Sequence, residues 1–129
     1  MKFKNLIAMT LATAMGCIST AHANYERLYA QIDEYDKTPS QIAKQYHAVY
    51  RAAILHHWKQ PKGAQGAYVR VRMSIKPDGS VRSARIDTLT DELRISMENA
   101  IYAAQPYTIP TAPSASRLAM KVDTVFFVK

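Results

Sequence analysis

Apolar residues recur at helical spacing between residues 39 and 58. Thr38, Pro39 and Gln41 precede them in the pattern of a capping box with proline at the first helical position. Together these features predict a helix of about five turns that buries one face and ends before Pro61. The apolar positions of this helix are Ile42, Tyr46, Val49, Tyr50, Ala53, Ile54 and Trp58.

The spacing of the apolar positions changes to two after a loop at residues 62–66, which predicts a strand that begins at Tyr68. Pro77 and Gly79 then predict a tight turn, because proline presets one backbone dihedral angle and glycine accepts a positive one. A second strand is expected to return over residues 80–89. The apolar positions of the first strand are Val69, Val71, Met73 and Ile75.

The returning strand needs an irregularity to bury its apolar residues. Val81 and Ile86 are five positions apart, so a regular strand would place them on opposite faces. A bulge near Ser83 and Ala84 would turn both side chains toward the core, and we predict it there. The hairpin would then present one continuous apolar face to the helices.

A second amphipathic helix is predicted to start at Thr90, which two acids follow at positions where the helix dipole favours them. Pro106 is expected to stop it. Residues 107–116 are rich in Pro, Thr, Ser and Ala and predict a loop. Strand-like alternation resumes over residues 118–128 and predicts a third strand.

These elements predict an α+β fold in which three antiparallel strands take the order 2-1-3 and two helices pack on one face. The third strand is then an edge of the sheet, with backbone groups available to another chain. Residues 24–38 also have apolar side chains at helical spacing, so they would form a short amphipathic helix or a mobile lead-in. Residues 39–129 would form the single folded domain.

The first 23 residues have the features of an export signal. Two lysines precede an apolar stretch that is shorter than the about 20 residues of a membrane span. Ala21 and Ala23 supply the small residues that a signal peptidase requires. We therefore predict cleavage after Ala23, a periplasmic location and no stable membrane span in the processed chain. A lipoprotein processed at Gly16-Cys17, with the lipid on Cys17, is the alternative.

Cys17 is the only cysteine, so the exported domain is expected to fold without disulfides and to depend on its hydrophobic core. The chain has 17 basic and 10 acidic residues and a formal net charge of +7. In an exported protein this excess favours acidic protein surfaces or other envelope anions as partners over nucleic acid. Ordinary solubilising charge is the other interpretation.

Short motifs follow one another in a fixed order over residues 42–128. They are Trp58-x-x-Pro61, the alternating strand, Asp78-Gly79-x-Val81 with Ile86, and the segment from Leu93 to Ala104-x-Pro106-Tyr107. This ordered set resembles the C-terminal domain of TolA and its TonB-like relatives. No Tyr-Pro pair follows the Trp-x-x-Pro motif, which favours TolA over TonB, and Arg94 stands where these domains commonly carry Asp.

The resemblance implies a periplasmic interaction domain that pairs its edge strand with a partner, here an envelope protein or peptide in a Tol–Pal or TonB-type process. A self-assembling homodimer, residues 25–36 folded over the open sheet face, and a secreted inhibitor or immunity-type factor are the alternatives. The predicted contact residues are Lys121, Val122, Asp123, Thr124, Val125, Phe126 and Phe127.

No motif of a reaction centre is present, so we predict neither an enzyme nor a cofactor. His56 and His57 do not share a helix face, and no acid lies at ligand spacing from them, so no metal site is predicted. The first strand carries a basic row that is a candidate surface for an acidic partner or a lipid head group, although a solvated sheet face is the simpler interpretation. The row consists of Arg70, Arg72 and Lys76.

Overall fold

The computed structural model describes residues 25–129, and the chain divides into two units, residues 1–31 and 32–129. In the described part of the first unit, residues 25–30 are helical. The predicted signal peptide and the alternative lipidation site Cys17 lie outside the described residues. Across residues 25–129, no helix has both the length and the apolar character needed to cross a membrane.

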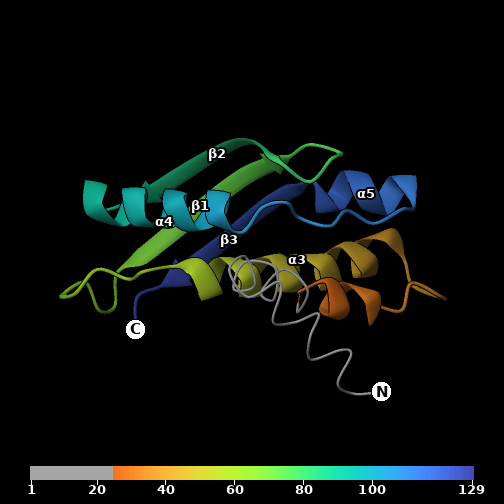
Figure 1. Ribbon diagram of the computed structural model, residues 1–129, viewed down its shortest axis with the longest axis horizontal. Helices are drawn as coiled ribbons and strands as arrows, with labels where there is room; N and C mark the ends of the chain where they lie inside the picture. Colours follow the sequence, from red (N-terminus) through yellow and green to blue (C-terminus); the bar gives the residue numbers. More distant parts are fainter. Residues whose placement is uncertain (1–24) are drawn as a thin grey trace, which may run out of the picture. The chain divides into compact units, whose positions relative to one another are not determined.

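The second unit has the predicted α+β fold (Figure 1). The strands form one antiparallel sheet in the order β2-β1-β3, which confirms the predicted topology. α3 packs against α4 and α5, and α4 packs against β1 and β2. The elements are α3 (Pro39–His57), β1 (Tyr68–Ile75), β2 (Val81–Thr88), α4 (Asp91–Ala103), α5 (Pro113–Ala119) and β3 (Lys121–Phe127).

α3 begins and ends as its flanking residues dictate. The Thr38 hydroxyl accepts a hydrogen bond from the Gln41 N–H at 3.1 Å, and the Gln41 side chain accepts one from the Thr38 N–H at 2.9 Å. Trp58 leaves helical geometry and turns into the core, where its indole N–H donates to Ser96 at 3.0 Å. Its ring packs edge-on against Phe126, with ring centres 6.0 Å apart. Trp58 therefore joins α3 to α4 and to β3.

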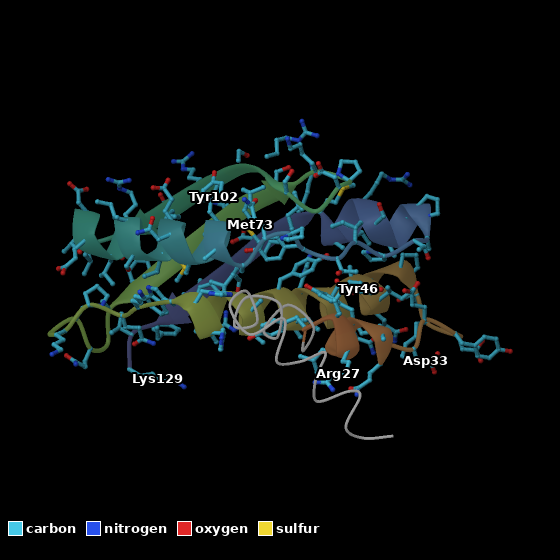
Figure 2. The ribbon with its side chains drawn as sticks, in the orientation of Figure 1. Arg27, Asp33, Tyr46, Met73, Tyr102 and Lys129 are labelled. Atoms are coloured by element: carbon cyan, nitrogen blue, oxygen red, sulfur yellow. The ribbon has the colours of Figure 1, made fainter. Side chains whose placement is uncertain are left out.

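The core lies between the helices and the inner face of the sheet, and it follows the predicted apolar positions. Met73 of β1 is 4% exposed, whereas Tyr102 of α4 is 42% exposed (Figure 2). Each helix and each strand named above contributes at least one buried side chain. The largest fully buried side chains are those of Tyr50, Phe126, Ile54, Ile75, Leu93, Met97, Ile101, Val69 and Val71.

The predicted bulge in β2 is present, but it lies closer to the turn than expected. The pairing with β1 skips Arg82 rather than a residue at Ser83 or Ala84. The effect is the predicted one, since Val81 and Ile86 both lie opposite core-facing residues of β1. The hairpin therefore presents one apolar face to the helices.

The loop predicted after Tyr107 is wrong in its second half, because Pro113–Ala119 forms α5. Proline stands in the first turn of α5, and two alanines four positions apart are fully buried. The strand predicted from Leu118 therefore begins only at Lys121, and Leu118 is a helical residue that is 47% exposed. From Lys121 onward the predicted alternation is correct, with Val122 facing the core.

The turn between β1 and β2 is fastened to the loop that follows α4. Gly79 has a φ of +90°, and its carbonyl accepts a hydrogen bond from the Tyr107 N–H at 2.8 Å. Tyr107 is itself buried, with its ring centre 5.2 Å from that of Tyr50. Its hydroxyl donates to the Ile101 carbonyl at 2.7 Å. The hairpin tip is thus held by a residue that belongs to the core.

Replacing Gly79 by alanine is expected to lower the free energy of unfolding by about 2–4 kcal/mol. A Cβ at this position would lie 2.3 Å from the Tyr107 carbonyl oxygen, and the positive φ is also unfavourable for alanine. Gly63→Ala is the matched control, because Gly63 has a φ of +84° but open space around its Cβ position. Urea unfolding measures both, and equal losses would contradict the role of the close approach.

Candidate functional site

β3 pairs with β1 on one side only, so its other side is an edge of the sheet, as predicted. The 2.8 Å hydrogen bond from the Ile75 N–H to the Met120 carbonyl sets the alternation of the ladder between the two strands. Every second residue of β3 therefore directs its N–H and C=O groups away from β1. From the centre of β3 to its end, these residues are Asp123, Val125 and Phe127.

Arg51 of α3 covers part of this edge. Its guanidinium donates to the Thr124 hydroxyl at 2.7 Å and to the outward carbonyl of Val125 at 2.8 Å. It also lies 4.4 Å from the centre of the Phe126 ring, in cation–π contact. Among residues 25–129, by contrast, no hydrogen-bond acceptor is found for the three outward N–H groups. The outward N–H groups of the edge are therefore available to a partner, whereas the outward carbonyl of Val125 is already bonded to Arg51.

The seven predicted contact residues of β3 divide between two faces. Val122 and Phe126 are buried in the core, so their side chains are not available to a partner. Thr124 points the same way and is bonded to Arg51. Phe127 is on the opposite, open face and is 59% exposed. Lys121, Asp123 and Val125 share that open face with it.

The predicted basic row is largely neutralised by its neighbours in the sheet. Arg70 donates two hydrogen bonds to Asp123, at 3.0 and 2.8 Å, and Arg72 pairs with Asp87. The bonds from Arg70 lower the pKa of Asp123, and the same bonds raise the pKa of Arg70. Lys76 follows the end of β1. Two of the three cations in the row are therefore held in cross-strand ion pairs, which favours the simpler of its two interpretations.

The acids of residues 32–36 do not neutralise that row. Glu34 instead accepts a hydrogen bond from the Tyr46 hydroxyl at 2.9 Å. Burial and then this bond raise the pKa of Tyr46 to about 12. The Asp33 carboxylate accepts from the nearby Tyr35 N–H at 2.9 Å. The alternative in which these acids fold onto the basic row is therefore wrong for residues 32–36.

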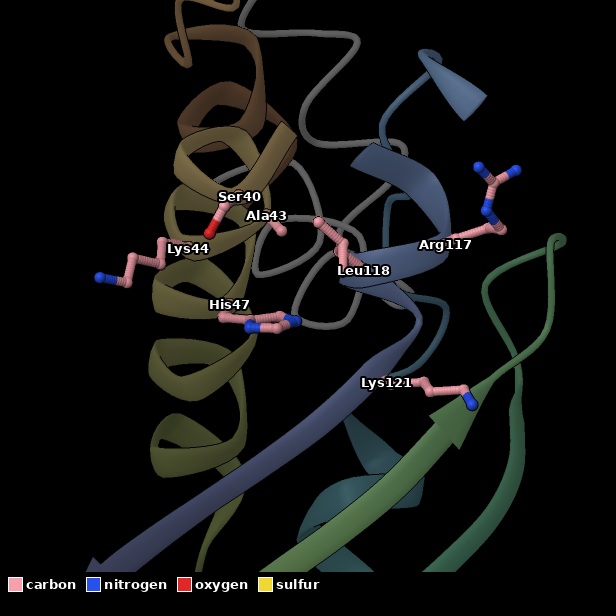
Figure 3. A pocket seen from close by; sticks show the side chains of 7 residues that line it. All are labelled: Ser40, Ala43, Lys44, His47, Arg117, Leu118 and Lys121. Atoms are coloured by element: carbon pink, nitrogen blue, oxygen red, sulfur yellow. The ribbon is translucent and has the colours of Figure 1, made fainter. Parts of the chain in front are cut away.

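A trough runs along the flank of α3 and leads to the edge of β3. Its first hollow, of about 290 Å³, lies between α3 and α5 (Figure 3). A second hollow of about 170 Å³ continues past Arg51 to Val122, Asp123 and Thr124. We call the two together the α3 trough. The basic residues along it are Lys44, His47, Arg51, Arg117 and Lys121, and Asp123 is its one acidic residue.

The α3 trough is basic, because its one acid, Asp123, is bonded to Arg70. The Nε2 atom of His47 lies 3.1 Å from the Ala119 carbonyl, so it carries a hydrogen and donates, because a carbonyl only accepts. Figure 3 shows the imidazole between α3 and α5, whereas Lys44 and Arg117 extend outward from the two walls. Within the part of the chain that the structure describes, no carboxylate forms an ion pair with Lys44, Arg117 or Lys121.

The sequence did not reveal this trough, because its residues come from three elements. His47 and Ala119 are 72 positions apart, and α5 was not predicted at all. The only available signal was the placement of Lys44, His47 and Arg51 at spacings of three and four, which puts them on one side of the helix. Over residues 25–129, no group of three metal-ligating side chains is present.

Comparison with known proteins found no family model that matches the chain and no match among curated proteins. The resemblance to the C-terminal domains of TolA and TonB therefore stays a prediction. Three features of the structure bear on function. They are the outward N–H groups of β3 that lack acceptors among residues 25–129, the Arg51 guanidinium on the Val125 carbonyl, and the basic α3 trough beside that edge.

Replacing Arg51 by alanine is expected to lower the free energy of unfolding by about 1–2 kcal/mol. The change removes two hydrogen bonds to β3 and a cation–π contact with Phe126. Arg82→Ala is the control, because Arg82 is exposed and forms no ion pair with the other described residues. Urea unfolding measures both variants, and equal small effects would show that Arg51 does not hold β3.

Proposed function

We propose that this protein is a periplasmic interaction module, similar in role to the C-terminal domain of TolA, that binds envelope proteins or peptides by adding their strand to β3. The observation that supports this is the row of three outward N–H groups on β3 that lack acceptors within residues 25–129. An extended chain that lies along the edge would satisfy them. Main-chain pairing of this kind supplies affinity, and the side chains beside it supply selectivity.

β3 is a better docking edge than β2, which borders the sheet on its other side. The bulge at Arg82 interrupts β2, and a bulge disrupts pairing with any further strand. The Val81 N–H at the start of β2 is already bonded to the Gln105 side chain at 3.0 Å. β3 is regular over its seven residues. The proposal therefore places the partner on β3.

Docking on β3 requires an exchange at Val125. The carbonyl of Val125 now accepts from Arg51, and an incoming strand would donate its own N–H to the same oxygen. One hydrogen bond replaces another there, so the net change at this atom is small. The three outward N–H groups of β3 gain acceptors in the same step. Strand addition therefore has a favourable balance of backbone hydrogen bonds.

Proline in place of Val125 is expected to abolish partner binding and to leave the domain folded. The Val125 N–H points away from β1, so proline removes a docking donor without removing a ladder bond. Thr124→Pro would remove a donor to β1 and should unfold the domain. Val125→Ala keeps the outward N–H and should retain binding. Circular dichroism separates loss of fold from loss of binding.

A photoreactive residue at Phe127, introduced into the protein in its own cells, is the readout for this prediction. We expect it to capture a specific envelope protein when position 125 is valine and to lose that product when it is proline. A photoreactive residue at Ser83, which is exposed on the open face of β2, is the control for random contact. Equal capture from both strands, or capture that survives the proline, would contradict strand addition at β3.

A homodimer is the second candidate, favoured by exposed apolar side chains at one end of the open face. Tyr68 and Phe127 lie opposite each other in the pairing of β1 with β3 and are 45% and 59% exposed. Leu89, which follows β2, is 73% exposed. A second copy of the chain would cover such a group of side chains, since contiguous exposed apolar patches mark interaction sites.

If this group forms a dimer interface, Phe127→Ser should shift the protein from dimer to monomer in sedimentation velocity, because it removes the apolar area that drives association. Leu118→Ser is a suitable control, since Leu118 is also exposed but belongs to α5. A protein that sediments as a monomer across a wide concentration range would exclude the dimer and leave strand addition to a different partner.

A further inference from the structure

We propose that the segment that binds at β3 is acidic and that its carboxylates pair with the cations of the α3 trough. This inference rests on the proposed function, because it assumes an extended chain at the edge of β3. It adds the chemistry of that chain, which the open N–H groups alone do not specify. Backbone pairing selects an extended conformation, whereas the charges beside it select the side chains.

The contrast between two surfaces of the domain is the first argument. On the open face, Arg70 and Arg72 are each paired with a carboxylate of a neighbouring strand. Along the α3 trough, the cations have no such partners among residues 25–129. A concentration of positive charge that the fold leaves unbalanced attracts negative ligands.

Asp123 is the one acid along the trough, and it does not balance these charges. Its carboxylate is held by two hydrogen bonds from Arg70 on the open face. Its backbone, in contrast, faces the edge. Asp123 therefore offers an N–H group to a docked strand, and its negative charge is directed to the other side of the sheet.

The shape of the trough favours a peptide over a flat anionic surface. The hollow between α3 and α5 is a concave site of about 290 Å³ whose wall includes the apolar side chains of Ala43 and Leu118. An extended chain that leaves the β3 edge at Lys121 would continue into this hollow. That chain would run between the α3 wall, which carries Lys44, and the α5 wall, which carries Arg117, and both cations extend outward at the rim of the hollow.

Arg51 provides the closest link between charge and docking. When an incoming N–H takes the Val125 carbonyl, the guanidinium loses an acceptor at a site beside the Phe126 ring. A carboxylate on the incoming strand would replace that acceptor with a stronger, charge-assisted hydrogen bond. A neutral or basic side chain would leave the guanidinium without an equivalent partner. Acidic segments should therefore bind more tightly than neutral or basic ones.

The test uses fluorescent peptides of about ten residues, long enough to span β3. One peptide alternates glutamate with valine and threonine, and a second has lysine at each glutamate position. A third repeats the acidic sequence with N-methyl groups on alternate backbone nitrogens, which blocks strand pairing and keeps the charge. Fluorescence anisotropy with the purified protein measures each affinity at low and at physiological salt.

We expect the acidic peptide to bind at least about tenfold more tightly than the lysine peptide at low salt, with the difference shrinking as salt screens the charges. Lys44→Glu and Arg117→Glu should each weaken the acidic peptide about threefold to tenfold. Arg82→Glu makes the same change of net charge on β2, on the far side of the sheet, and should leave the affinity nearly unchanged.

Three results would overturn the inference. They are equal binding of the acidic and lysine peptides, an equal loss in the Arg82→Glu control, and no binding of the acidic peptide by the folded protein. The N-methylated peptide tests the proposed function separately. If it binds as tightly as its parent, strand addition is wrong, while a preference for acidic over lysine peptides would still support the basic trough as an anion site.

Discussion

The alternating burial of β1 is the constraint on which the rest of the structure depends. Val69, Val71, Met73 and Ile75 all face the core, and both other strands pair with β1. A shift of one residue would turn Arg70 and Arg72 into that core, which the apolar interior does not permit. The same register decides which backbone groups of β3 point outward. The hydrophobic pattern of the central strand therefore determines the chemistry of the edge.

Two basic surfaces have different electrostatic surroundings, although they look alike in the sequence. Arg70 and Arg72 lie on β1, and the neighbouring strands carry Asp123 and Asp87. The cross-strand ion pairs with these acids neutralise the charges of both arginines. Lys44 and Arg117 stand on helices that face each other across a hollow without an acid between them. Where a protein leaves charge unbalanced is decided by the packing of elements, not by the number of basic residues.

Sequence patterns predicted the features that depend on neighbouring residues. The capping box at Thr38, the turn at Gly79 and the alternation of β1 are all confirmed. Each depends only on residues that are close together in the sequence. The bulge lies at Arg82 and not at the predicted position, because the pattern requires one extra residue between Val81 and Ile86 but does not specify which one. Seven-residue α5 was missed because no side-chain cap marks its start.

The candidate site was predicted only in part, for the same reason. The β3 edge follows from topology, which local patterns determine well. The contact between Arg51 and Val125 joins residues 74 positions apart and depends on how α3 lies against the sheet. No spacing rule gives that placement. The trough likewise exists only once α3, α5 and β3 have packed together.

The guanidinium on Val125 has one further consequence. An exposed β-edge invites identical chains to stack on it without limit, and long regular edges are a known cause of aggregation. Arg51 places a positive charge at this edge. A second copy of the chain also has a net positive charge and would be repelled by it. This charge therefore disfavours the stacking of identical chains along the β3 edge.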